Sequence, residues 1–491
     1  MILPYFIIIP LIAAFLISLI AGKKDQWAIS LSLIAIIAVL VLSVYSFIIF
    51  QKETLIYNMS GWKFPFGIVL VMDALTSFML VMVSIISLTS IIFSVQYIRY
   101  IDMDWKYYSL FMLLVTGMNG VIITGDLFNL FVFMEIALFA AFILVAYGRK
   151  AEEFEAAFKY AVMGGVSSIL VLLGIAILYS ATSTLTMAKV AEELKLLNPK
   201  ITLWVGGLFL VGFGLKAAVM PFHAWLPDAH SSAPAPISAM LSGVLIKALG
   251  LYVIIRIFFN VLDAPIIFTK AFLILGAISI LLGVFLAIGQ WDLKRLLAYH
   301  SVSQIGYMLL GLGLATPLGI LGGVYHLFNH AMFKSLLFYN AGSVELALGT
   351  RDLQKMGNVV KILPVTAQTS MIASLSISGI PPFNGFFSKL IIIIASIQAG
   401  EFWFAFFAVV GSLFTLASFM KVQRYGFRGE NIIEIVKEKI GWQMNIAMIL
   451  LAFLCLLTSL LIIPGIKEVT LDPVVNVIVQ KAQYFNLMTG R

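Results

Sequence analysis

The stretch GFGLKAAVMPFHAWLPDAHSSAPAPISAMLSGVLIKALG (residues 212–250) decides the fold class of this chain. It begins in one apolar segment and ends in another, and each is long enough to cross a bilayer. Between them, Pro221 interrupts a helix that carries Lys216, and a second helix restarts and carries Lys247. A lysine near the middle of a membrane helix costs roughly 3 kcal/mol on insertion scales. Two such lysines beside a broken helix are difficult to explain by packing, so we expect the functional site here.

The composition is that of a polytopic membrane protein. Of the 491 residues, 62% are hydrophobic and 11% are charged, and the mean hydropathy is +1.07; these values lie outside the range of soluble globular proteins. The formal net charge of +8 then indicates basic residues at the membrane surface rather than nucleic-acid binding. The single cysteine, Cys455, excludes a disulfide framework and a cysteine-ligated iron–sulfur or zinc site within this chain.

Apolar stretches of membrane-spanning length recur along almost the whole chain. They predict an all-α polytopic membrane protein with about 14 transmembrane helices in a single membrane domain, residues 1–491. The first segment has no basic n-region and no cleavage site of small residues, so we expect it to be retained. The predicted helices are residues 2–21, 27–50, 68–97, 107–124, 127–147, 157–180, 201–220 with a continuation to 230, 236–258, 267–290, 296–315, 317–343, 362–379 with a continuation to about 399, 403–423 and 443–464.

Two of these spans are interrupted in the same way. The seventh breaks at Pro221 just after Lys216, and the twelfth breaks at Pro381-Pro382 before Lys389. Breaks at corresponding positions in two halves of a transporter indicate inverted repeats. We therefore predict two inverted five-helix repeats, with the seventh and twelfth helices broken. The predicted parts are residues 1–98 (helices 1–3), 107–258 (helices 4–8), 267–423 (helices 9–13), 443–464 (helix 14) and a short tail, 465–491.

The basic residues indicate an orientation and a chemistry. Loops after odd-numbered helices carry more Lys and Arg than the opposite loops, so we expect them to be cytoplasmic and both termini to lie on the outer side of the cell membrane. The basic residues that we assign to the interiors of spans are all lysines. Lysine can lose its proton when it is desolvated, whereas arginine effectively cannot. The pattern suggests proton handling by Lys216, Lys247, Lys334 and Lys389.

Glu135 lies deep in the predicted fifth span, with no charged residue within eight positions on either side. We expect this carboxylate to be coupled to Lys216, because ionisable groups at membrane depth mark ion paths. The alternative is a structural ion pair. Asp126 and Asp73, at the starts of the fifth and third spans, are expected to be helix caps.

His326, His330 and Lys334 follow one another at intervals of four residues. Each interval advances only about 40° around a helix, so the three side chains share one face. Imidazoles titrate near neutral pH and can pass protons to a lysine. Two histidines at this spacing can also bind zinc, but no acidic or thiol ligand accompanies them, and no metal is expected. Histidines that only hydrogen-bond between helices are the other alternative.

Polar residues gather at the joint after the broken seventh helix. His223, Asp228 and His230 are candidates for proton uptake or release, or they satisfy the freed backbone groups. His300, which follows Lys294, is expected at the membrane interface. No nucleotide-binding fingerprint occurs, so the sequence supports neither ATP hydrolysis nor nicotinamide binding, and no cofactor is expected.

Five pieces of the sequence, from helix 4 to helix 13, match a known family. They are TGDLFNLFVFMEI (124–136), KAAVMPFHAWLPDAHSSAPAPISAMLSGVLIKALG (216–250), WDLKRLLAYHSVSQIGYM (291–308), HLFNHAMFKSLLF (326–338) and SGIPPFNGFFSK (378–389). These pieces resemble the antiporter-like subunits shared by respiratory complex I, multisubunit Mrp-type cation/proton antiporters and membrane-bound hydrogenases. The piece at 124–136 looks closest to the D-type subunit of the Mrp antiporters.

The resemblance implies a fourteen-helix fold with two inverted repeats and a polar axis in mid-membrane. It also implies a role for each matching residue: a Glu135–Lys216 pair, connecting groups Lys247, His326 and His330, a central Lys334 and a terminal Lys389. The tail would reach only about 40 Å if it were wholly helical. It is therefore too short to replace the long lateral helix of the largest complex I member.

We therefore expect a proton-translocating subunit of a multisubunit membrane complex, with other membrane subunits as partners and with coupling to Na⁺ left open. A change of charge on Glu135 would alter the proton affinity of Lys216, since unit charges 4 Å apart interact by roughly 4 kcal/mol at a dielectric constant of about 20. The alternative is the pump module of a hydrogenase, related reductase or complex I-like oxidoreductase whose redox centres lie in other subunits. A structural scaffold with vestigial lysines is a third hypothesis. Whether the complex is an enzyme stays open, because this chain has no redox or hydrolytic motif.

Overall fold

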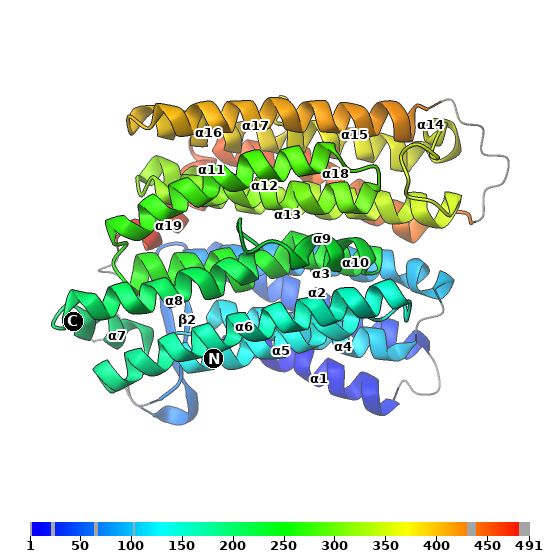
Figure 1. The fold of residues 1–491 in the computed structure, drawn as a ribbon. Helices are drawn as coiled ribbons and strands as arrows, with labels where there is room; N and C mark the ends of the chain where they lie inside the picture. Colours follow the sequence, from blue (N-terminus) through cyan, green and yellow to red (C-terminus); the bar gives the residue numbers. More distant parts are fainter. Residues whose placement is uncertain (1, 21–24, 63–66, 102–103, 430–437, 481–491) are drawn as a thin grey trace.

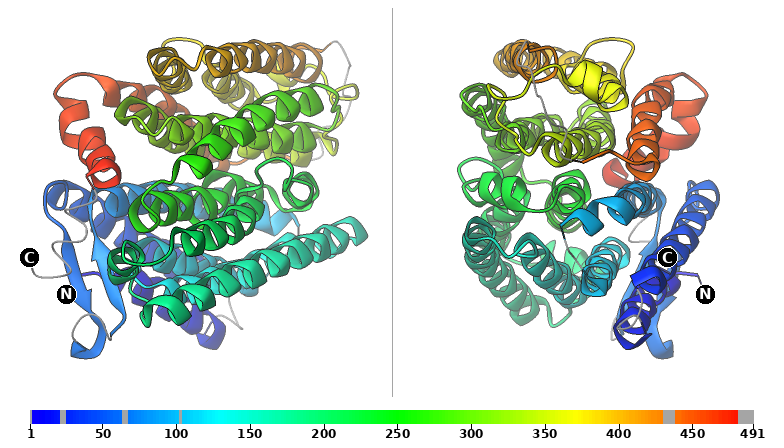
Figure 2. Two further views of the ribbon diagram at one scale, coloured as in Figure 1. Left: turned by 60° about the vertical axis from the view of Figure 1, so that its left-hand side comes forward. Right: turned by 90° about the vertical axis from the view of Figure 1, so that its right-hand side faces the viewer.

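The computed structural model describes residues 2–20, 25–62, 67–101, 104–429 and 438–480. Its helices run side by side in one bundle, which the right-hand view of Figure 2 shows nearly end-on. The first half of the chain, up to α10, forms the lower part of Figure 1, and α11 to α17 form the upper part. The all-helical, polytopic prediction is confirmed at this level.

Helices make up most of the described chain. The α-helices are α1 (Tyr5–Ile20), α2 (Asp25–Ile49), α3 (Ala74–Tyr100), α4 (Trp105–Ile123), α5 (Leu127–Val145), α6 (Ala151–Thr182), α7 (Met187–Leu194), α8 (Pro199–Ala217), α9 (Trp225–Ser232), α10 (Ala235–Met240), α11 (Ile266–Ile288), α12 (Leu293–Gly313), α13 (Pro317–Leu348), α14 (Val359–Ile362), α15 (Pro364–Ser378), α16 (Asn384–Gln398), α17 (Phe402–Lys421), α18 (Trp442–Leu457) and α19 (Ile466–Val479). The 3₁₀ segments are η2 (Met59–Gly61) and η7 (Thr458–Ile462), and the π-helical segments are η3 (Leu241–Leu245), η4 (Lys247–Tyr252), η5 (Ile255–Val261) and η6 (Val422–Phe427).

Ten helical stretches within the described residues are long and apolar enough to cross a membrane. α1 and α16 are shorter apolar helices. Each predicted span has a helical counterpart in the structure, with boundaries that differ by a few residues. α7 and α14 were not predicted, and both lie in connections that we read as loops.

A two-stranded hairpin precedes α3 and corrects the predicted start of the third span. β1 (Leu55–Asn58) pairs antiparallel with β2 (Val69–Met72), so the apolar run from residue 68 is first a strand. Asp73 then caps α3, because its carboxylate accepts a hydrogen bond from the Thr76 N–H at 2.8 Å. Asp126 caps α5 in the same way. Both predicted caps are confirmed.

Both interrupted spans are broken where proline predicts it. The first break separates α8 from α9, and the second separates α15 from α16. Backbone groups freed at such breaks need partners inside protein. At the first break, the Met220 N–H donates to the Ser279 hydroxyl at 3.0 Å and the Trp225 indole donates to the Leu215 carbonyl at 2.9 Å. The predicted continuation to residue 230 is thus a separate short helix.

The segment 235–261 is wider than an ordinary helix and entirely buried. It begins as α10 and continues through the π-helical turns η3, η4 and η5. At Gly250 this segment approaches the end of α8 so closely that a Cβ would lie 2.6 Å from the Ala217 Cβ. Packing of η4 against α8 therefore requires glycine at this position.

Arg256 corrects the expectation that only lysines occupy span interiors. It lies within the predicted span 236–258, and its side chain is buried in η5. The Asp73 carboxylate lies 2.6 Å from one guanidinium nitrogen. A permanently charged arginine is tolerated at this depth because a buried carboxylate pairs with it directly.

α13 lies at the centre of the fold. It contacts helices of both halves, among them α10, α12, α15, α16 and α18, and almost all its residues are buried. Part of the predicted tail returns to the bundle as α19, which contacts α3 and α13. The Asn260 amide donates to the Val477 carbonyl at 3.0 Å. Residues 481–491 of the tail lie outside the described residues.

Candidate functional site

Glu135, Ser168 and Lys216 form a polar contact between α5, α6 and α8. The Lys216 ammonium lies 3.9 Å from the Glu135 carboxylate and donates a hydrogen bond to the Ser168 hydroxyl at 3.0 Å. That hydroxyl in turn donates to the same carboxylate oxygen. The structure thus brings together the two residues that the sequence paired. It adds Ser168, which the sequence did not indicate.

Local structure accounts for the position of Lys216. α8 ends one residue later, and Ala218 caps it in the left-handed conformation. A cation in the last turn of a helix interacts favourably with the helix dipole. The Lys216 side chain is 2% exposed, whereas that of Glu135 is 24% exposed on the flank of the bundle. The carboxylate is therefore the member of the pair that a neighbouring molecule can reach.

Lys247 and Lys334 lie in the interior, and both donate to backbone carbonyls. Lys247 donates to the Ser242 carbonyl in the preceding turn, and Lys334 donates to the Leu297 carbonyl of α12. Both side chains are fully buried. Ser242 lies in the π-helical segment η3, whereas Leu297 lies in the regular helix α12.

His230 also lies in this interior. It is 0% exposed, its ring centre is 6.1 Å from that of Phe338, and it interacts electrostatically with Lys247 and Lys334. Neither ring nitrogen has a hydrogen-bond partner among the described residues. A buried histidine without partners is a place for water or a transferred proton. The structure therefore separates His230 from the joint residues with which the sequence grouped it.

His326 and His330 precede Lys334 on α13 at intervals of four residues, as the sequence predicts. The two imidazole rings have centres 6.4 Å apart. His326 contacts the Ser388 hydroxyl at 2.9 Å through Nδ1 and the Gln304 amide oxygen at 3.2 Å through Nε2. His330 has no hydrogen-bond partner among the described residues. The side chains of α13 therefore lead from Lys334 toward α16. We call Lys247, Lys334, His330, His326 and Lys389 the buried row.

Lys389 stands at the far end of this row, beside the break between α15 and α16. Its ammonium donates to the Ile377 carbonyl at 2.7 Å and contacts the Ser412 hydroxyl at 3.4 Å. It also lies 4.6 Å from the centre of the Tyr307 ring. The carbonyl that accepts its bond is one that the helix break leaves free.

The remaining joint residues lie nearer the surface. His223 is half-buried, with Nδ1 3.3 Å from the Pro221 carbonyl. Asp228 forms ion pairs with Lys159 at 2.9 Å and Arg295 at 3.1 Å. Both are therefore in place to satisfy local groups at the end of the bundle.

His300 corrects the expectation of an interfacial position. It is fully buried, and its Nε2 lies 2.8 Å from the Ser418 hydroxyl of α17. α12 begins at Leu293, so His300 is about two turns inside the helix. The charged residues that precede it mark the helix start and not the depth of the histidine.

The electrostatics of the row are unusual for a folded interior. Among the described residues, no carboxylate forms an ion pair with Lys247, Lys334 or Lys389. A permanently charged ammonium in such surroundings is costly. Groups of this kind are therefore suited to take up and release protons. The described residues contain no group of three or more His, Cys, Asp or Glu side chains that could hold a metal ion.

Comparison with known proteins gives the same family that the sequence motifs suggested. The family model described as NADH:quinone oxidoreductase/Mrp antiporter, TM, matches residues 124–415. The chain is 36% identical over 430 residues to the D subunit of the Na(+)/H(+) antiporter of Alkalihalophilus pseudofirmus, covering 86% of this chain and 87% of that protein.

Two solved structures have the same fold. A chain of the Mrp complex from Dietzia sp. DQ12-45-1b superimposes with a TM-score of 0.92 at 26% identity, covering 99% of this chain and 98% of that chain. A chain of the membrane-bound sulfane sulfur reductase, an archaeal respiratory membrane complex, gives a TM-score of 0.89 at 29% identity, covering 98% of this chain and 99% of that one. This multi-pass membrane protein therefore belongs to the NADH:quinone oxidoreductase/Mrp antiporter family, as an antiporter-like subunit of the Mrp Na⁺/H⁺ antiporter or complex I type.

Proposed function

We propose that this subunit translocates protons along the buried row that the site residues form. One observation carries the proposal: Lys247, Lys334 and Lys389 are buried with neutral hydrogen-bond acceptors and without an ion-pair partner among the described residues. Lysines in such surroundings can exchange protons, whereas arginines cannot. The proposed path comprises Glu135, Lys216, Lys247, His326, His330, Lys334 and Lys389, with His223, Asp228 and His230 as candidates for uptake or release.

Charge coupling at Glu135 starts the transfer. At the 3.9 Å separation of this carboxylate from Lys216, unit charges interact by roughly 4 kcal/mol at an effective dielectric constant of about 20. If a neighbouring molecule protonates the Glu135 carboxylate or neutralises its charge, the proton affinity of Lys216 would therefore change by up to about a thousandfold. The displaced proton would then move through Lys247 into the part of the path that Lys334, His330 and His326 form on α13.

For the architecture, we propose fourteen spans with two inverted five-helix repeats, residues 107–258 and 267–423. The two helix breaks support this, since each repeat contains one break beside one buried lysine, Lys216 or Lys389. The distribution of basic loop residues supports an orientation in the cell membrane with both termini outside.

The partners we propose are the other membrane subunits of a multisubunit complex. The partly exposed Glu135 on the flank of the bundle is one group that such a subunit can contact. Sodium sites are rich in oxygen ligands, and the proposed path from Glu135 to Lys389 contains Glu135 as its single carboxylate. We therefore place any Na⁺ path in a partner subunit, with this chain moving H⁺.

A second candidate function is favoured by the similarity to the sulfane sulfur reductase chain. In that case the same row would be the pump module of a hydrogenase, reductase or complex I-like enzyme, and electron transfer in other subunits would drive it. Purification of the tagged chain in mild detergent, with mass spectrometry of the subunits that accompany it, distinguishes the two. Small membrane subunits alone indicate an antiporter, whereas cysteine-rich soluble subunits indicate a redox-driven pump.

The experiment that tests the path is Lys216→Ala in the assembled complex, assayed in everted membrane vesicles by cation-induced change of the pH gradient. The matched control is Lys200→Ala, since Lys200 is an exposed lysine at the other end of the same helix. The path predicts loss of transport in the first variant and a normal rate in the second, with normal assembly in both. Normal transport in Lys216→Ala would refute the path. Altered assembly with normal flux would favour a structural scaffold.

A further inference from the structure

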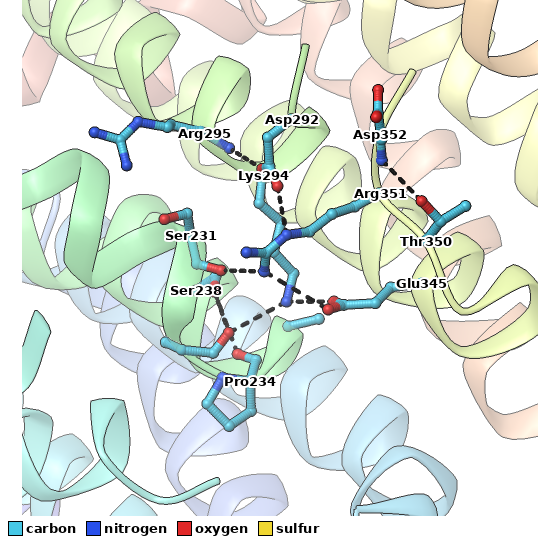
Figure 3. Close-up of polar contacts among 12 residues, drawn as sticks. Ser231, Pro234, Ser238, Asp292, Lys294, Arg295, Glu345, Thr350, Arg351 and Asp352 are labelled. Atoms are coloured by element: carbon cyan, nitrogen blue, oxygen red, sulfur yellow. Dashed lines mark hydrogen bonds and ion pairs between the residues drawn. The ribbon is translucent and has the colours of Figure 1, made fainter. Parts of the chain in front are cut away.

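A second lysine–glutamate pair lies at the end of the bundle where α12 begins and α13 ends (Figure 3). The Lys294 ammonium is 2.6 Å from the Glu345 carboxylate, and the lysine side chain is 2% exposed. Arg351 lies 3.6 Å from the same carboxylate and 2.5 Å from that of Asp292. None of these residues belongs to the proposed path, and all lie outside the predicted spans 296–315 and 317–343.

The two cations of this cluster hold the last two residues of α9 and the two residues that join it to α10, which together we call the α9–α10 link (residues 231–234). Arg351 donates to the Ser231 carbonyl at 2.9 Å, and Lys294 donates to the Ala233 carbonyl at 3.3 Å. The Ser238 hydroxyl lies 3.1 Å from the Ala233 carbonyl and 2.8 Å from the His230 carbonyl. The position of the link therefore depends on two cations, whose charges Glu345 and Asp292 balance.

The link separates a polar cavity from His230. Ser232, Ala233 and Pro234 line a cavity of about 670 Å³, together with Lys294 and other polar residues. Tyr97, Tyr100, Lys150, Glu152, Glu153, Glu345, Arg351 and Glu438 face the same cavity. An adjoining cavity of about 380 Å³ shares Glu152, Ser232 and Arg351 with it. On the inner side, His230 is fully buried with both ring nitrogens lacking partners among the described residues.

α13 connects the two sides of this barrier. Glu345 follows Lys334 by eleven residues, which on a helix is about 20° of rotation and about 16 Å of rise. It therefore lies on the face of α13 that carries Lys334. Between these positions α13 closes against α10, since a Cβ on Gly342 would clash with the Ala235 Cβ. The Ala235 N–H also donates to the Tyr97 hydroxyl at 3.3 Å.

We propose that Lys294, Glu345 and Arg351 are positioning residues for proton transfer, which hold the α9–α10 link closed over His230 and so control proton exchange between the cavity and the buried row. This inference rests on the proposed function. When the Lys294–Glu345 contact opens, the Ala233 carbonyl loses its cationic donor and the link can move. A hydrated proton from the cavity then transfers to a ring nitrogen of His230, leaving water behind, and passes on toward Lys334.

The test is the rate at which an imposed pH gradient decays in everted vesicles that contain the complete complex, with no exchangeable cation present. Glu345→Gln removes the carboxylate charge while keeping its size. We expect the gradient to decay about tenfold faster, as for a tenfold larger population of the open state. Adding Lys334→Ala to this variant should restore the slow decay, because the leak passes through the row. Lys294→Arg should retain the slow decay, since it preserves the ion pair.

Glu155→Gln is the matched control, since Glu155 is an exposed glutamate that lines only the adjoining cavity. It should leave the decay unchanged. If Glu345→Gln assembles and its decay equals that of the wild type, the proposal is wrong. It is also wrong if the leak persists with Lys334→Ala, because the proton then crosses elsewhere.

If Glu345→Gln fails to assemble, a double variant still tests the proposal. Lys294→Gln with Glu345→Gln removes both charges and leaves neither unpaired, so it should assemble where the single variant does not. If the double variant also fails, the pair is required for folding, and the positioning role is refuted. Lys334→Ala alone separates this proposal from the function on which it rests. Normal transport in that variant refutes the path, whereas lost transport without a leak in Glu345→Gln refutes only the control of the link.

Discussion

The Lys216 ammonium lies 3.9 Å from the Glu135 carboxylate, and the Ser168 hydroxyl bridges the two. The serine turns a loose ion pair into a hydrogen-bonded chain across three helices. One end of this chain is buried, and the other is partly exposed on the flank of the bundle. A charge that changes beside Glu135 is therefore transmitted to a lysine at the end of a broken helix.

Ser168→Ala should weaken this coupling without removing either charge. We expect transport per assembled complex to fall by about tenfold or more, because a hydrogen bond to a charged group contributes roughly 1.5 kcal/mol or more. The measurement is cation-induced proton release in everted vesicles. Ser18→Ala, which removes a serine–serine contact between α1 and α4, should leave the rate unchanged. Equal rates in the two variants would show that the bridge has no part in transport.

The Asp73–Arg256 pair predicts a stability effect. Both side chains are at most 4% exposed, so Asp73→Asn leaves a buried guanidinium without its counter-charge. We expect a loss of about 3–5 kcal/mol, measured as a lower thermal unfolding temperature of the purified complex. Asp73→Asn combined with Arg256→Gln should lose less, because no charge is left unpaired. An unchanged unfolding temperature in the single variant would contradict the pairing.

The Lys294–Glu345 pair predicts a specific pH dependence. Burial by itself would lower the pKa of Lys294, but the Glu345 carboxylate together with Tyr97 outweighs burial, and the pKa is raised. Burial by itself would raise the pKa of Glu345, but Lys294 together with Arg351 and Lys150 outweighs burial, and the pKa is lowered. Both groups therefore stay charged through the neutral range.

The stabilisation follows from the signs of these shifts. The raised lysine pKa stabilises the fold below the ordinary value of about 10.4, and this is lost as the pH rises through the folded value. The lowered glutamate pKa stabilises it above about 4.3, and this is lost as the pH falls through the folded value. The unfolding free energy of the wild type minus that of Lys294→Gln/Glu345→Gln should thus be constant between about pH 5 and pH 10. A difference that changes near pH 7 would contradict the pair.

Much of the proposed path could be predicted from the sequence because its ionisable residues stand in apolar segments where such residues are rare. Glu135 stands alone in an apolar span, and Lys216 and Lys389 stand beside prolines. Such residues are conspicuous in a membrane helix. Ser168 is not conspicuous, because the hydroxyl of a serine in an apolar helix often hydrogen-bonds only to the backbone of its own helix.

The second cluster could not be predicted for a different reason. Lys294 lies in the charged run WDLKRLL, which is typical of a solvated helix start. It is buried because the chain after α13 folds back over it: the Leu293 N–H donates to the Arg351 carbonyl, and the Leu353 N–H donates to the Trp291 carbonyl. No local pattern specifies such a long-range contact.

The fold shows the same division. The prolines predicted both helix breaks correctly, and hydropathy predicted the long helices but not the short α7 and α14. Strand β2 and the wide turns of η3 to η5 were not predicted, because strands and π-turns in apolar sequence share the composition of a membrane helix. Arg256 was misjudged because its partner, Asp73, is distant in the sequence.

The measurement that tests the proposed path most directly is proton transport by Lys334→Ala and Lys334→Arg in the assembled complex. Alanine removes the titratable group, and arginine keeps a positive charge that cannot be released. We predict that both variants assemble and that transport falls to background in both, with Lys200→Ala at the wild-type rate. Transport at the wild-type rate in Lys334→Arg would contradict the path, because a permanent charge at the centre of the row cannot relay a proton.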